Sequence, residues 1–165
     1  MSSLWRCPCC GRRFANRNQS HACGRGFRLA DHYAGRDPAV VATFRALVAA
    51  ARRNGPVTVL PEKTRIAFQV RMSFAAFTLK KHWLHGHVVL ARRRESPRFE
   101  KIWGPSPRNQ VHVFTLRGPE EVDEEVAEWL REAYAVGEQK HLRPLPLTLD
   151  PSPLRGEGPT GPRDP

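Results

Sequence analysis

The residues 65–71, Arg-Ile-Ala-Phe-Gln-Val-Arg, place an apolar side chain at every second position. Successive side chains of a β-strand point to opposite faces, so Ile66, Phe68 and Val70 fall on one face of an extended chain. The pattern predicts a strand that rests one face on an apolar core. A period of two recurs through residues 57–116, which favours a sheet over a bundle of helices.

Further strand candidates lie on both sides of this stretch, at 57–60, 74–79, 83–92, 99–103 and 111–116. The connections between them are short, and short connections join antiparallel strands. We therefore expect an antiparallel sheet of about five strands.

The sheet is flanked by two segments with helical spacing of apolar residues. The first, 38–53, has Asp37 as a candidate cap and Pro38 in its first turn, and Asn54-Gly55-Pro56 stops it. The second, 119–136, has acidic residues in its first turn, which suits the helix dipole, and an apolar stripe through Trp129. The fold class expected is α+β: a zinc knuckle, a helix, the sheet and a closing helix.

Composition divides the chain into three parts. Residues 1–36 are rich in Cys, Arg and Gly and hold too few aliphatic side chains to fold unaided. Residues 37–142 carry the α+β domain. Residues 143–165 are dominated by Pro, Gly and Leu without any period, which predicts a disordered tail.

A zinc site is predicted by the sequence Cys7-Pro8-Cys9-Cys10-Gly11 followed by His21-Ala22-Cys23-Gly24. A Cys-x-x-Cys turn that ends in Gly directs two thiolates at one ion. Residues two apart in an extended chain point to the same side, so the second pair can meet the same metal. The predicted ligands are Cys7, Cys10, His21 and Cys23, in a closed site with no position open for substrate.

Other interpretations of this segment stay open. Cys9 or, more weakly, His32 can replace one of the four ligands. The cysteines can also be free thiols or a redox pair, although a redox Cys-x-x-Cys usually follows a strand. All four cysteines fall within residues 1–23, and in a reducing cytoplasm such a cluster indicates metal ligation rather than disulfides.

The formal net charge of +11 lies entirely outside the tail, because three Arg balance three acids in residues 143–165. A basic surface favours acidic partners, including nucleic acid, anionic lipid and acidic proteins. Charge concentrates in residues 1–36 and 80–108, with Trp83 and Trp103 as candidate stacking surfaces. The candidate phosphate contacts are Arg12, Arg13, Arg17, Lys80, Lys81, Arg92, Arg93 and Arg94.

Signatures of enzymes are mostly absent. The sequence has no phosphate-cradling glycine loop and no Gly-x-Ser-x-Gly elbow. His85 and His87 share a strand face, and His112 is expected to lie opposite them on that face. The remaining enzymatic hypothesis is an enzyme that uses this Arg- and His-rich sheet. No apolar run is long enough to span a membrane, and no signal peptide is recognisable, so a cytoplasmic location is expected.

Five segments together resemble a bacterial family known as domain of unknown function 5655: WRCPCCGRRF at 5–14, NQSHACG at 18–24, GPVTVLPEKTRIAFQVRMSFAAF at 55–77, SPRNQVHVF at 106–114 and EVDEEVAEWLREAYAVGEQ at 121–139. The resemblance implies a bacterial origin and an α+β domain after a zinc-knuckle-like segment. It implies no established activity and excludes the tail.

The function expected is therefore that of a zinc-stabilised small basic binding protein, with nucleic acid as the first candidate partner. The alternatives are a protein-interaction adaptor and an uncharacterised enzyme. We expect no catalytic residues.

Overall fold

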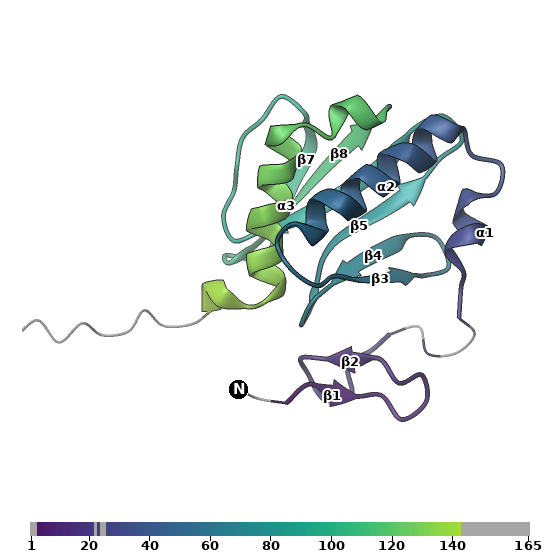
Figure 1. The fold of residues 1–165 in the computed structure, drawn as a ribbon. Helices are drawn as coiled ribbons and strands as arrows, with labels where there is room; N and C mark the ends of the chain where they lie inside the picture. The colour runs from purple at the N-terminus through teal and green to yellow at the C-terminus, as the bar shows by residue number, and fades with distance from the viewer. Residues whose placement is uncertain (1–2, 22, 24–25, 143–165) are drawn as a thin grey trace, which may run out of the picture.

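The structure, a computed structural model, describes residues 3–21, 23 and 26–142 (Figure 1). Its main body is α+β and contains a six-stranded antiparallel sheet, where about five strands were expected. The expected order of helix, sheet and closing helix is confirmed. The tail expected at 143–165 lies outside the described residues.

The strands of the main sheet are β3 (Thr58–Pro61), β4 (Ile66–Gln69), β5 (Ser73–Leu79), β6 (Leu84–Leu90), β7 (Phe99–Ser106) and β8 (Asn109–Leu116). Their order across the sheet is β3-β4-β5-β6-β8-β7, and neighbouring strands are antiparallel. Because β8 returns between β6 and β7, the long connection at 91–98 carries the chain past β8 to the sheet edge.

The helices are α1 (Leu29–Tyr33), α2 (Pro38–Arg52) and α3 (Glu124–Gly137), with short 3₁₀ turns η1 (Pro119–Glu121) and η2 (Lys140–Leu142). α2 and α3 lie across one face of the sheet (Figure 1) and bury Phe44, Phe77, Phe114 and Trp129 between the two layers. The predicted strand face is confirmed for Ile66 and Phe68, which are both fully buried. Burial of this apolar surface is the main force that holds the body together.

Helix α2 begins at Pro38 as predicted, whereas its expected cap and the start of the closing helix differ. Asp37 stands at the N-cap of α2, but its carboxylate makes no capping bond and instead pairs with His82 at 2.6 Å. The closing helix starts at Glu124 rather than Pro119, because the extended backbone of Asp123 separates it from η1. The Asp123 carboxylate caps this helix by accepting from the Val126 N–H at 3.1 Å.

A small hairpin of β1 (Trp5–Arg6) and β2 (Arg13–Phe14) lies beyond β3 in Figure 1. It is tied to the main sheet where the buried Gln69 amide donates to the Arg13 carbonyl at 2.7 Å. Helix α1, which the sequence did not predict, joins the two parts and rests Leu29 and Tyr33 on the core. Among the described residues, no helix combines the length and the apolarity that crossing a membrane requires.

Candidate metal centre

The turn between β1 and β2 brings two cysteines to the same side. The Gly11 N–H donates to the Cys7 carbonyl at 2.9 Å, and the Cys7 N–H donates to the Arg12 carbonyl at 2.8 Å. Gly11 has a φ of 72°, in the left-handed region that glycine enters without strain. This closed turn lets the thiols of Cys7 and Cys10 face one point.

The chain returns to this point through His21 and Cys23. The Sγ atoms of Cys7 and Cys23 are 3.6 Å apart, and Cys10 Sγ is 3.2 Å from His21 Nε2. All four candidate ligand atoms lie within 4.8 Å of one another. The four residues named from the sequence thus come together in a group that could hold a metal ion.

The imidazole of His21 is oriented by its neighbours. Its Nδ1 lies 2.7 Å from the Gln19 carbonyl, which can only accept, so Nδ1 carries the proton and Nε2 presents its lone pair to the cluster. The Phe14 ring lies 4.4 Å from the imidazole centroid and Trp5 lies 6.0 Å from Phe14. These two aromatics pack beside the site, and Trp5 lies 6.5 Å from the His21 ring.

The thiols of the cluster do not ionise alike. The N–H of Cys10, as the largest cause, lowers the pKa of Cys7 to about 6. The N–H of Arg12 is the largest cause that lowers the pKa of Cys10. The pKa of Cys23 is raised instead, chiefly by a hydrogen bond with the Cys9 thiol. Backbone donors aimed at two sulfurs of the turn create an environment that favours thiolates there.

The two alternative ligands are outside the group of four, although the Cys9 thiol lies close enough to hydrogen-bond with Cys23. Cys9 is exposed and is not one of the four converging residues. The Nε2 atom of His32 donates to the Glu62 carbonyl at 2.8 Å, at the end of β3. His32 is therefore engaged away from the cluster, and Cys9 is a neighbour of the four converging residues.

The eight candidate phosphate contacts do not form one surface. Arg12, Arg13 and Arg17 belong to the hairpin region, and Lys80 and Lys81 follow β5. Lys80 and Lys81 lie in the β5–β6 turn, before β6 begins, and residues 92–94 follow the end of β6. These two groups therefore lie at opposite ends of strand β6. Sequence reasoning also missed Arg36 and Lys63, which join Lys80 and Lys81 only through the tertiary fold.

Two members of the 92–94 group have acidic partners in the structure. Arg93 pairs with Glu95 at 2.6 Å. The Arg94 guanidinium pairs with Glu128 and Glu132 of α3, both at 2.7 Å. These ion pairs hold helix α3, which is rich in Glu, against the 91–98 connection.

The Arg94–Glu128 pair predicts an acid-dependent stability. The Arg94 hydrogen bond is the largest cause that holds the pKa of Glu128 below its ordinary value of 4.5. A depressed folded-state pKa stabilises the fold above pH 4.5, and this stabilisation is lost as pH falls through the folded-state value. Arg94→Gln is expected to lower the melting temperature by a few degrees, about 1–4 °C, at pH 7.

The measurement is thermal unfolding of both chains at pH 7 and pH 3. The difference between the two melting temperatures is expected to shrink as the pH falls, because the stabilisation is lost as Glu128 becomes protonated. Arg92→Gln is the control for a neighbouring charge, because Arg92 is the smallest cause of the lowered pKa of Glu128 and forms no ion pair with it in the described part of the chain. A difference that persists undiminished at pH 3 contradicts the assignment.

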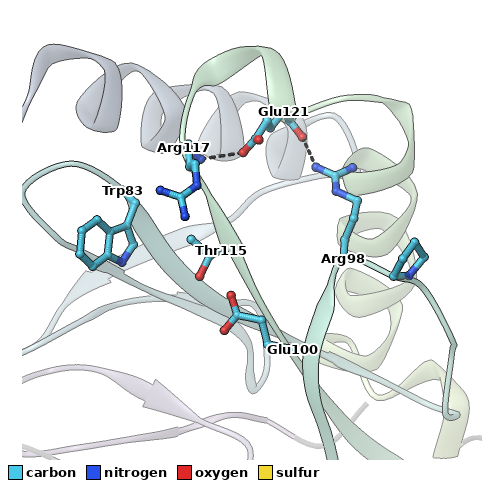
Figure 2. Close-up of a pocket in the computed structure, with 7 residues that line it drawn as sticks. Trp83, Arg98, Glu100, Thr115, Arg117 and Glu121 are labelled. Carbon is cyan, nitrogen blue, oxygen red and sulfur yellow. Dashed lines mark hydrogen bonds between the residues drawn. The ribbon is translucent and has the colours of Figure 1, made fainter.

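A hollow of about 400 Å³ lies beside Trp83 between β7, β8 and η1 (Figure 2). Figure 2 shows Arg98 turned toward Glu121, whose carbonyl accepts from Arg98 Nη2 at 2.7 Å. The Glu121 carboxylate accepts from the Arg117 N–H at 2.6 Å. With Glu100 on its floor, the hollow balances two arginines with two glutamates and has no excess charge.

The histidines of the sheet do not converge. His85 and His87 pair with Thr115 and Val113, whereas His112 pairs with Val88 and so lies on the opposite, helix-covered face. This corrects the expectation that His112 faces the other two. Its Nε2 accepts from the Arg94 N–H at 2.9 Å, which makes it a support of the 91–98 connection. Burial lowers the pKa of His87 to about 4.

The arginines of the enzymatic reading are dispersed as well. Arg65 pairs with Glu62 at 2.7 Å, and Arg71 donates to the Gln139 side chain at 3.3 Å. His112 lies on the other face, and none of four hollows lined by described residues gathers Arg65, Arg71 and His85.

A family model described as "Domain of unknown function (DUF5655)" matches residues 29–137. This range runs from the start of α1 to the end of α3. It supports the resemblance for the α+β body and leaves the Cys- and His-bearing segments at 5–14 and 18–24 outside the match. No curated protein and no solved structure matches the chain.

Proposed function

We propose that this chain, which belongs to the DUF5655 family of domains of unknown function, is a small binding protein built from a zinc-stabilised N-terminal unit and an α+β domain that contacts nucleic acid. One observation supports the zinc-stabilised unit. Four candidate ligand atoms lie within 4.8 Å of one another, and they belong to Cys7, Cys10, His21 and Cys23. The family supplies no activity, so the proposal depends on this chain's own residues.

Zinc is the metal that suits this group best. Three thiols and one imidazole are the ligands of structural zinc sites, with zinc–sulfur bonds of about 2.3 Å and a zinc–nitrogen bond of about 2.0 Å. Tetrahedral geometry then separates ligand atoms by roughly 3.5–3.8 Å. The observed 3.6 Å between Cys7 and Cys23 fits this spacing, and 3.2 Å between Cys10 and His21 is close to it. Four protein ligands leave no open position, so the metal would be structural.

The proposed domain organisation keeps the expected parts: 1–36 as the zinc unit, 37–142 as the α+β domain and 143–165 as a tail. The last part of the zinc unit is attached to the α+β domain, because Leu29 and Tyr33 of α1 rest on its core. The Tyr33 ring lies 6.1 Å from that of Phe44 in α2.

Nucleic acid is proposed as the partner because several cationic side chains have no acidic partner among the described residues. Five of them are exposed and Arg12 is half-buried; the set is Arg12, Arg13, Arg17, Lys80, Lys81 and Arg92. Phosphate groups attract such side chains and release counterions on binding. The dispersal of these residues over three places, and the neutralised Arg93 and Arg94, favour weak binding without base recognition.

Binding to nucleic acid is expected to be weak and steeply dependent on salt. If about four phosphates are neutralised, log K should fall against log salt with a slope of roughly −3 to −4 on duplex DNA. The measurement is a fluorescence titration of labelled duplex and single strands at several salt concentrations. Arg12→Ala combined with Arg13→Ala and Arg17→Ala should flatten the slope, whereas Arg94→Ala should leave it nearly unchanged.

Absence of binding at low salt contradicts the nucleic-acid half of the proposal. The alternative is then a protein-interaction adaptor.

A further inference from the structure

A second hollow gathers positive charge where α1 meets the β3–β4 turn and the end of β5. Its volume is about 420 Å³, and its walls include Arg36, Lys63, Lys80 and Lys81, with Phe27 at one side. We call it the lysine hollow. The four cationic residues come from three separate segments of the chain, so the fold alone assembles them.

The carboxylates beside the lysine hollow are occupied elsewhere. Asp31 accepts from the Arg28 N–H at 3.0 Å, Asp37 pairs with His82 at 2.6 Å, and Glu62 pairs with Arg65 at 2.7 Å. No ion pair of Arg36, Lys63, Lys80 or Lys81 occurs within the described residues. Asp31 also lines the hollow, so its four cationic residues face one carboxylate and the excess charge of the hollow stays positive.

Arg36 contributes a guanidinium with an unpartnered donor to the wall of the hollow. Its Nε is buried and has no hydrogen-bond partner in the part of the chain that the structure describes. A buried donor without a partner destabilises the fold unless a ligand or water accepts from it. Arg36 lines the lysine hollow, and a planar guanidinium there suits the oxygens of a phosphate group.

Phe27 adds an aromatic surface to the same hollow. It is one of the few large apolar side chains left exposed in the described chain, with 38% of its surface accessible. An aromatic face beside a cationic pocket binds a nucleobase by stacking while the cations hold its phosphates.

We propose that the lysine hollow is a binding site for a phosphorylated nucleotide unit, with Arg36, Lys63, Lys80 and Lys81 on the phosphates and Phe27 under the base. The unit can be a free nucleotide or one position of a single strand, because the chemistry of recognition is the same. This inference deepens the proposed nucleic-acid binding. It rests on that proposal only where the ligand is one position of a single strand and not where it is a free nucleotide. The hollow beside Trp83 in Figure 2 is the weaker candidate, since its arginines are matched by glutamates.

The test uses the full chain and isothermal titration with ADP, pyrophosphate, adenosine and a ten-nucleotide oligothymidylate. The variant Lys63→Gln/Lys80→Gln/Lys81→Gln is expected to lose at least about tenfold in affinity for ADP and pyrophosphate. The control Arg53→Gln/Lys101→Gln/Arg108→Gln removes the same charge from exposed positions outside the hollow and should bind within about twofold of the parent. Adenosine should bind far more weakly than ADP.

Phe27→Ala separates stacking from charge. This variant should lower the affinity for ADP at least about fivefold and keep the affinity for pyrophosphate within about twofold of the parent. Melting temperatures of all variants should stay close to that of the parent, because the replaced side chains are exposed.

The outcomes are distinguishable. ADP binding without oligothymidylate binding supports the hollow and overturns the nucleic-acid half of the proposed function. Oligothymidylate binding that the hollow variant and the control variant weaken equally overturns the hollow and leaves the proposed function standing. No binding by ADP, pyrophosphate or oligothymidylate overturns both.

Discussion

A Cys7→Ser chain is expected to lose its bound zinc and, with it, the ordered structure of residues 3–21. This segment buries little of its own, since Cys7 and Phe14 are its buried apolar side chains among the described residues. Metal binding must therefore supply its folding energy, and structural zinc sites supply about 10–16 kcal/mol in zinc-finger peptides at neutral pH. Cys10→Ser and Cys23→Ser should have the same effect, because each removes one of the converging ligand atoms.

The measurements are zinc content by elemental analysis and the amide spectrum of residues 3–21 by NMR. Cys9→Ser is the matched control and should keep one zinc per chain, since Cys9 lies outside the group of four. His85→Gln/His87→Gln should also keep it, because these histidines lie on the main sheet. A freshly purified, reduced protein without zinc would falsify the metal assignment, and zinc that is lost with Cys9 alone would show that the wrong thiol was chosen.

Trp129→Ala is expected to destabilise the α+β domain by about 3–5 kcal/mol. The Trp129 side chain is fully buried, with Phe99 at 4.3 Å and Phe114 at 5.3 Å between ring centroids, and the Arg98 guanidinium stacks 5.3 Å from it. Removing the indole leaves a cavity at the junction of α3 with the sheet. Since domains are stable by only about 5–15 kcal/mol, a sizeable fraction of the chain should unfold at physiological temperature.

Urea unfolding followed by circular dichroism measures this loss. Trp103→Ala is the control for loss of a tryptophan, because Trp103 is 49% exposed, and its cost should stay below about 1 kcal/mol. Trp129→Phe should cost clearly less than Trp129→Ala, since it keeps an aromatic ring and removes an indole N–H that has no partner among the described residues. Equal costs for Trp129→Ala and Trp103→Ala contradict the packing described.

The candidate metal centre was open to prediction because its determinants are local. A Cys-x-x-Cys turn closed by Gly11 needs only short-range backbone geometry, and His21 and Cys23 converge through the period of an extended chain. The choice among Cys7, Cys9 and Cys10 was harder from sequence, since it depends on which thiols the folded turn directs inward. The role of the Gln19 carbonyl in orienting His21 could not be predicted, because every residue has a backbone carbonyl and the residue type does not show which one accepts a hydrogen bond.

The sequence by itself determined the positions of α2, α3 and the strands of the main sheet, since side-chain periodicity and turn residues act over a few positions along the chain. Only the tertiary structure decided how distant segments meet. The insertion of β8 between β6 and β7 turns His112 toward the helices and brings Arg94 to Glu128 and Glu132. The same through-space assembly gathers Arg36, Lys63, Lys80 and Lys81, because strand order sets which segments adjoin, and periodicity along the chain carries no information about it.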